Sequence, residues 1–130
     1  MSDKLDLVRS IYATIGRGDY SSAEWADAEI EYVHADGPEP GGVTGREGLV
    51  RAMRNLFGAF EDFCAEAEDC RELDAQRVLA LTKASGRGKT SGLEISVKGA
   101  EVFEIHSGKV TRIVVYFDRD RALADLGVKE

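Results

Sequence analysis

The sequence predicts an α+β domain in which helices near the N-terminus pack against a long antiparallel sheet. Apolar residues recur at helical spacing before residue 16 and again after residue 44. From about residue 63 onward, apolar and polar residues alternate, which is typical of strands with one face on a core. With 130 residues, the chain has the length of a single domain with one core, spanning 1–130.

Two helices are expected before the first strand. The first has its apolar face formed by Leu5, Val8, Tyr12 and Ile15. The glycines at 16 and 18 are expected to end it. A second, short helix is expected to begin at about residues 19–22, where Ser21 and Glu24 make a capping-box pair, and to carry Trp25.

The next segment predicts a strand, a loop and a third helix. In the strand at 29–34, Tyr32 and His34 fall on the apolar face. Residues 35–45 contain both prolines and four glycines, so they are expected to form a loop without regular structure. Thr44 and Glu47 are expected to cap the third helix, whose apolar stripe is Leu49, Met53, Leu56, Phe57 and Phe60.

Four strands and a short final helix are predicted after residue 62. The strands cover about 63–68, 77–84, 93–105 and 110–117, with a turn at Ser107 and Gly108. In the second of them, Ala80, Thr82 and Ala84 share the inward face and are small, which leaves room for a ligand beside the sheet. Asp118 is expected to cap the last helix, and Gly127 to end it.

The last hairpin has two plausible registers. A two-residue turn would set Arg112 beside Phe103 on the inner face. A three-residue loop with Gly108 in the left-handed conformation would place Ile113, Val115 and Phe117 there instead. The second register is favoured because it avoids burying an arginine, and it leaves Arg112 and Tyr116 on the outer face.

Glu101 is the most informative residue, because it places a carboxylate on the apolar phase of an alternating strand. The odd positions from 93 to 105 include Val97, Glu101 and Phe103 and should face the core. A carboxylate in an apolar place tends to stay protonated or to find a partner, so Glu101 is a candidate functional residue. Two alternatives are a bulge at Gly99 that turns the carboxylate to water, and an ion pair with an arginine across a subunit boundary.

Composition excludes several other functions. The net charge of −7, without a long basic run, makes nucleic acid and anionic membranes poor partners. Neither a signal peptide nor a membrane-spanning run is recognisable, so a cytoplasmic protein is expected. Cys64 and Cys70 lie too far apart along one strand for a disulfide, and the spacing of cysteines and histidines fits no structural metal site. Gly88-Lys89-Thr90 lacks the first glycine of a phosphate-binding loop and precedes a strand rather than a helix.

Three stretches resemble SnoaL-like members of the nuclear transport factor 2 superfamily. They are LVRSIYATIGRGDY, EWADAEIEYVHADGPEPGGVTGREGLVRAM and AEVFEIHSGKVTRIVVYFDRDRAL, and together they span nearly the whole chain. The resemblance implies a cone-shaped α+β barrel with an apolar pocket between the sheet and the helices. It also implies a homodimer formed through the outer face of the sheet, where Leu79, Leu81, Val102, Val110, Val114 and Tyr116 would supply apolar surface.

The resemblance also places individual residues. Glu101 falls close to the position of the protonated oxyanion-hole aspartate of ketosteroid isomerase, and near the acidic position of SnoaL-type cyclases. The position of that isomerase's catalytic base is occupied by Tyr32, and its helical tyrosine falls nearer Ile11 than Tyr12.

The resulting hypothesis is that the protein binds a small, largely apolar molecule. Glu101 would act as a general acid/base on a carbonyl or enol compound, with Tyr32 and His34 as hydrogen-bonding partners and no cofactor. The predicted pocket consists of Tyr12, Trp25, Met53, Phe57, Thr82, Val97, Phe103, Ile113, Val115 and Phe117. The alternatives are a binding module without turnover and a dimerisation scaffold whose cavity is filled by its own phenylalanines.

Overall fold

The computed structural model describes residues 3–16, 24–36 and 41–128; within these ranges, the side chains of Leu56 and Phe57 are not described. It contains three helices, α1 (Asp3–Gly16), α2 (Arg46–Gly58) and α3 (Arg119–Leu126). The strands are β1 (Ala26–His34), β2 (Gly41–Thr44), β3 (Phe60–Glu72), β4 (Arg77–Gly88), β5 (Glu94–His106) and β6 (Lys109–Tyr116). The predicted α+β fold class is confirmed.

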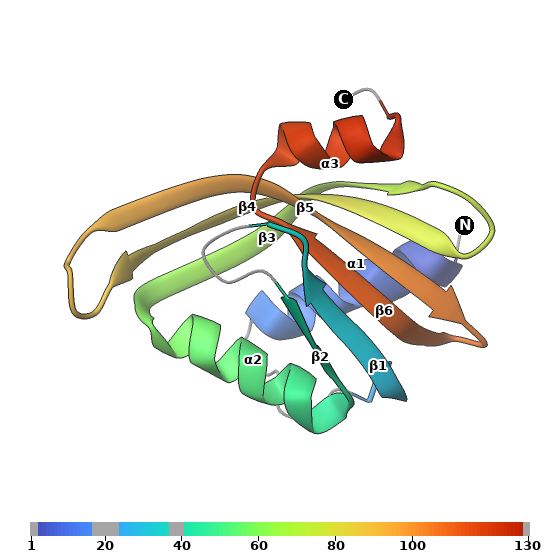
Figure 1. Ribbon diagram of the computed structural model, residues 1–130, viewed down its shortest axis with the longest axis horizontal. Helices are drawn as coiled ribbons and strands as arrows, with labels where there is room; N and C mark the ends of the chain where they lie inside the picture. The colour runs from blue at the N-terminus through green and yellow to red at the C-terminus, as the bar shows by residue number, and fades with distance from the viewer. Residues whose placement is uncertain (1–2, 17–23, 37–40, 129–130) are drawn as a thin grey trace.

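All six strands form one curved sheet in the order β2-β1-β6-β5-β4-β3 (Figure 1). Neighbouring strands pair antiparallel except β1 and β6, which run parallel. The central positions are taken by β6 and β5, and Glu101 lies in β5 with Val115 and Ala80 as its cross-strand neighbours. The sheet therefore carries the candidate residue at its centre rather than at an edge.

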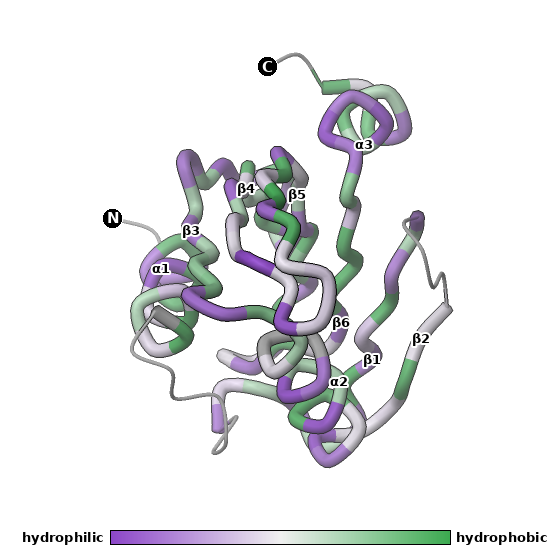
Figure 2. Tube along the Cα trace, turned by 90° about the vertical axis from the view of Figure 1, so that its left-hand side faces the viewer, coloured by the Kyte–Doolittle hydropathy of each residue, from purple (hydrophilic) through white to green (hydrophobic). Residues whose placement is uncertain are grey.

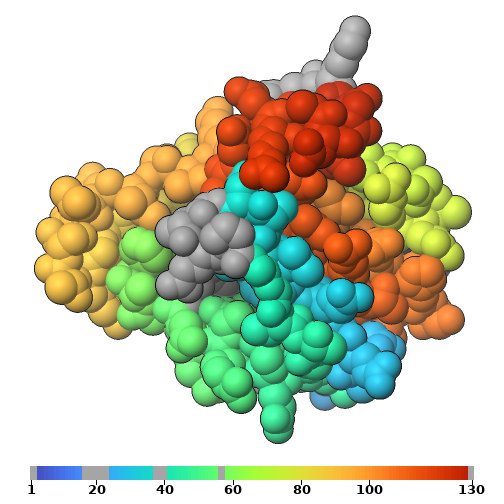
Figure 3. All heavy atoms as spheres, viewed as in Figure 1, coloured from blue at the N-terminus to red at the C-terminus, as the bar shows by residue number. Residues whose placement is uncertain are grey.

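Helices cover both faces of this sheet. α1 and α2 lie against the inner, concave side, whereas α3 lies on the opposite side, as Figures 1 and 2 both show. The inner core joins Val8 and Ile11 of α1 to buried side chains of the sheet such as Phe103. A separate apolar cluster on the outer face contains Leu79 and Tyr116 beneath Leu123 of α3, and Figure 3 shows α3 packed closely on the strands.

The ends of α3 are those predicted from the sequence. The Asp118 carboxylate accepts hydrogen bonds from the backbone N–H groups of Asp120 and Arg121, which are otherwise unpaired at a helix start. Gly127 ends the helix in the left-handed conformation, with φ of 67°.

A buried arginine fastens α3 to the sheet. Arg119 is only 8% exposed, and its guanidinium donates to the carbonyl oxygens of Thr82 at 2.7 Å and Gly99 at 3.2 Å. It also donates to the Glu68 carboxylate at 2.7 Å, and this partner lowers the pKa of Glu68. Because a buried charge is tolerated only when it is well paired, Arg119 fixes where α3 can sit.

Two expectations about secondary structure need correction, and a third falls largely on residues that are not described. Residues 41–44, expected to belong to a loop, form β2 and pair with β1. An edge strand needs only backbone hydrogen bonds, and the absent side chain of Gly42 allows close approach to the Tyr32 carbonyl. Phe60 was assigned to the helix but begins β3. The short helix expected around residues 19–22 lies outside the described residues, and Trp25 sits in a turn before β1.

The β5–β6 hairpin combines features of both predicted registers. Ser107 and Gly108 form a two-residue turn with φ of 52° and 77°, which pairs His106 with Lys109. One residue later the register shifts, so that Thr111 is an extra residue in β6. The bulge keeps Ile113 and Val115 on the inner face and Arg112 outside, as predicted, although by a different route.

The outer face does not present the apolar patch from which a dimer was predicted. Leu79, Leu81, Val102 and Tyr116 are buried beneath α3 within a single chain. Val110 is also buried, but the bulge turns it into the inner core. A homodimer therefore stays a prediction that rests on the resemblance alone.

Replacing Arg119 with alanine should destabilise the protein by about 2–4 kcal/mol, because two buried carbonyl oxygens lose their donor. Chemical denaturation would measure this change. Arg121→Ala is the matched control, since Arg121 on the same helix is half exposed and should cost less than about 1 kcal/mol. Equal costs for the two variants would show that Arg119 does not hold α3 in place.

Candidate functional site

A cavity of about 290 Å³ lies between the inner face of the sheet and helices α1 and α2. Its wall is almost entirely aliphatic and aromatic, with Glu101 as the charged group. Of the predicted pocket residues, those that line it are Tyr12, Trp25, Met53, Thr82, Val97, Phe103, Ile113, Val115 and Phe117, together with Glu101 and Tyr32 from the predicted catalytic set. The side chain of Phe57 lies outside the described part of the chain.

Glu101 faces this cavity because the strand ladder is unbroken around it. Pairing between β4 and β5 runs without a register shift, with Thr82 opposite Gly99 and Ala80 opposite Glu101. The strand therefore does not bulge at Gly99, and the carboxylate stays on the inner phase. Gly99 itself is required by close packing, because a Cβ there would collide with the carbonyl oxygen of Tyr116.

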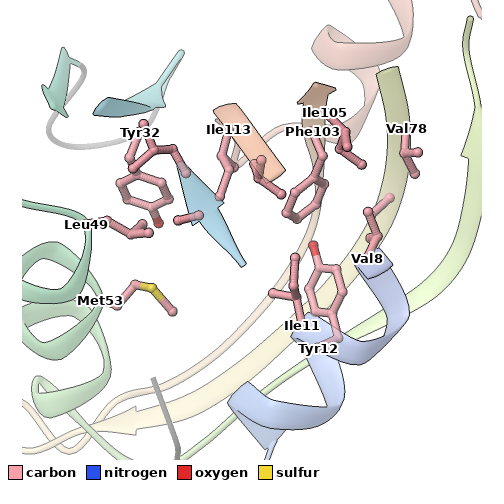
Figure 4. Close-up of a cluster of buried hydrophobic side chains, with 14 residues drawn as sticks. Val8, Ile11, Tyr12, Tyr32, Leu49, Met53, Val78, Phe103, Ile105 and Ile113 are labelled. Atoms are coloured by element: carbon pink, nitrogen blue, oxygen red, sulfur yellow. The ribbon is translucent and has the colours of Figure 1, made fainter. Parts of the chain in front are cut away.

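Tyr12 holds the Glu101 carboxylate from the helix side. The Tyr12 hydroxyl donates a hydrogen bond to Glu101 Oε1 at 2.8 Å. Helical spacing puts Tyr12 on the same face of α1 as the buried Val8, and its ring meets Phe103 edge to face at 5.9 Å between centroids. Figure 4 shows the Tyr12 ring beside Phe103, and this contact fixes the ring whose hydroxyl donates to the carboxylate.

Burial makes Glu101 a titratable group near neutral pH. Removal from water disfavours the carboxylate and raises its pKa to about 7, while the Tyr12 hydrogen bond opposes this by stabilising the charged form. The same burial and the nearby Glu101 charge raise the pKa of the Tyr12 hydroxyl. At neutral pH both forms of Glu101 are present, and Tyr12 remains a neutral donor.

Tyr32 and His34, expected as hydrogen-bonding partners of Glu101, are placed differently. Both lie on the inner face of β1, but β6 separates β1 from β5. The His34 ring packs edge to face between Tyr32 and Phe117, at 5.2 and 5.4 Å, and is not among the residues that line the cavity. Tyr32 does line it. The partner of Glu101 is Tyr12, which the sequence suggested only as a pocket residue.

Several cavity residues were not predicted. Ile11 and Ile15 of α1, with Phe60, Phe63, Ala65, Ile95, Gly99 and Tyr116 of the sheet, complete the lining, and Ala84, predicted to face inward beside a ligand, lines it as well. Alternation carries the signal for Ala84 and Ile95, which share the inward phase with Thr82 and Val97. Tyr116 carries no such signal, because its side chain packs with α3 on the outer face.

Neither a metal-binding cluster nor a membrane-spanning helix is found among the described residues. No group of three or more histidine, cysteine, aspartate or glutamate side chains in them could hold a metal ion. None of their helices is both long and apolar enough to cross a lipid bilayer.

Helices folded against a curved sheet, with one carboxylate in an apolar cavity, define an α+β protein of the nuclear transport factor 2 type. Residues 8–113 match the family described as SnoaL-like domain, and the chain belongs to this family. No curated protein matches the sequence.

Solved structures support the same fold. An NTF2-like protein of unknown function from Burkholderia pseudomallei superposes with a TM-score of 0.80 at 17% identity, over 95% of this chain and 97% of the other. TerC, co-crystallised with polyporic acid, gives 0.77 at 18% identity, over 96% and 98%. A protein with a ketosteroid isomerase-like fold from Catenulispora acidiphila, in complex with trimethylamine, gives 0.76 at 16% identity, over 95% and 93%.

Burial of Glu101 should make folding stability depend on pH. Its folded pKa of about 7 lies above the ordinary value of 4.5, so its contribution to stability is complete below pH 4.5 and is lost as pH rises through 7. The free energy of unfolding of Glu101→Gln, relative to that of the wild type, should therefore increase when the pH is raised from 4 to 8, by at most about 3 kcal/mol. Denaturant unfolding at the two pH values measures it.

The control for this prediction is Glu66→Gln, which removes an exposed carboxylate from β3. Subtracting its pH dependence isolates the effect of burial. A Glu101→Gln difference that does not grow with pH would contradict the described environment of the carboxylate.

Proposed function

We propose that the protein binds a small, largely apolar molecule in the cavity and that Glu101 exchanges a proton with it. The observation that carries the proposal is a carboxylate held by Tyr12 inside an apolar enclosure. A carboxyl group with a pKa of about 7 is suited to acid/base catalysis at neutral pH, because both protonation states are available.

The geometry gives the two carboxylate oxygens different roles. Oε1 accepts from Tyr12, which orients the group, and Tyr12 is the one hydrogen-bond partner that Glu101 has among the described residues. Oε2 is left to meet a ligand. In the charged form it can remove a proton from a carbon next to a carbonyl, and in the neutral form it can return that proton.

The cavity restricts the ligand by size and polarity. Its volume of about 290 Å³ equals that of roughly ten water molecules, enough for one or two fused rings. The apolar wall favours a ligand with few polar groups. The ligands named for two structures of the same fold, polyporic acid with TerC and trimethylamine with the Catenulispora protein, are also small molecules.

A binding module without turnover is the second candidate. It is favoured by the family resemblance, which sets Tyr32 near the position of the isomerase's catalytic base. The third reading, a scaffold that fills its own cavity, is disfavoured by the open volume beside Phe103 and Phe117.

The test uses 2-tetralone, a compact two-ring ketone with acidic protons beside its carbonyl. Binding is followed by the fluorescence of Trp25, the single tryptophan, which lines the cavity. Proton exchange is followed by NMR in deuterium oxide: the carboxylate takes a proton from the carbon to give the enolate, exchanges with solvent, and returns a deuteron. Wild-type protein should bind the ketone and speed the exchange.

Glu101→Gln should bind 2-tetralone yet lose at least about 100-fold in exchange rate. Glu104→Gln is the matched control, because Glu104 lies on the opposite face of β5 near Arg112 and should exchange as the wild type does. Binding without exchange in the wild type would favour the non-catalytic module. No binding at all would refute both readings.

A further inference from the structure

Tyr32 carries a hydroxyl for which the structure shows no hydrogen bond to another described residue, on a residue that lines the cavity. The residue is 8% exposed, lies in the inner core and lines the cavity. Figure 4 shows its ring reaching from β1 toward Leu49 and Met53, away from Tyr12. A buried tyrosine hydroxyl normally finds a partner, because leaving it unpaired costs the free energy of its lost hydration.

The sheet register keeps Tyr32 apart from Glu101. Tyr32 pairs with Ile113, which pairs with Phe103, and Glu101 lies two residues before Phe103. Two strand spacings of about 4.8 Å and two residues of about 3.3 Å put their Cα atoms about 12 Å apart on a flat sheet. The two side chains therefore reach the cavity from the two strands that flank β6.

The other tyrosines that line the cavity have their hydroxyls engaged. Tyr12 donates to Glu101, and Tyr116 is hydrogen-bonded to Asp125 of α3. Burial, together with the Glu101 charge, raises the pKa of Tyr32 far above its ordinary value. Its hydroxyl thus stays protonated and keeps a proton to donate.

We infer that Tyr32 binds an oxygen atom of the ligand, at a point separate from the atom that meets Glu101. The inference rests on the proposed function, because it requires a ligand in the cavity. It narrows the ligand to a compact, mostly apolar carbonyl or hydroxyl compound, with its oxygen toward β1 and its exchangeable proton toward β5. Tyr32 is then the residue that determines the orientation of the ligand.

The test compares two probes that differ by one oxygen, 2-tetralone and tetralin. For each protein, the ratio of the tetralin dissociation constant to that of the ketone measures how well the oxygen is recognised. Tyr32→Phe should lower this ratio by about five- to tenfold, the effect of one hydrogen bond, and leave the affinity for tetralin unchanged. Thr111→Val is the control, because it removes a hydroxyl that donates to the Glu104 carbonyl and does not line the cavity, so it should leave the ratio unaltered.

Other outcomes separate this inference from the proposed function. If both probes bind and Glu101→Gln, rather than Tyr32→Phe, lowers the ratio, the oxygen is held at Glu101 and the inference is overturned. If neither probe binds the wild type, the proposed function fails. Thermal unfolding adds a check that needs no ligand: Tyr32→Phe should unfold at the same temperature or higher, and a marked loss of stability would show that the hydroxyl has a partner in the protein.

Discussion

The site depends on one hydrogen bond, from the Tyr12 hydroxyl to the Glu101 carboxylate. It joins the first helix to a central strand and gives a polar group a defined position inside an apolar cavity. Without this hydrogen bond, burial alone would dominate the pKa of the carboxyl group, and the group would have no fixed orientation. With it, burial and hydrogen bonding act on the pKa in opposite directions, and their balance leaves Glu101 titrating near neutral pH.

The position of Glu101 also depends on contacts made through the back of the sheet. Arg119 of α3 donates to the carbonyl oxygens of Gly99 and Thr82. Gly99 lies two residues before Glu101 in β5, and Thr82 is its cross-strand neighbour in β4. Gly99 allows the Tyr116 backbone to approach closely at the same place. Helix α3 thus buries the outer apolar face and holds the strand segment that carries the carboxylate. A rigid strand is the support that a precisely positioned proton-transfer group requires.

Much of the fold could be predicted because local signals agree with the tertiary structure. Alternation placed Glu101 on the inner face, and capping residues located the start and end of α3. β2 could not be predicted, because its pairing uses backbone groups of glycine-rich residues that carry no pattern. The bulge at Thr111 could not be predicted for a similar reason, because alternation does not show where one strand gains an extra residue.

The candidate site was predicted in part. Periodicity shows which face a residue occupies, so Glu101, Tyr12 and Tyr32 could all be assigned to the cavity. It does not show distances between elements far apart in sequence, so Tyr12 was not identified as the partner of Glu101 across 89 positions. His34 shares the inner face, but its ring packs between those of Tyr32 and Phe117 and does not line the cavity. Alternation cannot reveal such packing.

The most direct measurement is the pKa of the Glu101 carboxyl, from its carbon-13 chemical shift as a function of pH. We predict a midpoint near pH 7 in the wild type. We also predict a higher midpoint in Tyr12→Phe, because the hydrogen bond that stabilises the charged form is lost. A midpoint near 4.5, or one that Tyr12→Phe does not move, would contradict the Tyr12–Glu101 hydrogen bond in the cavity.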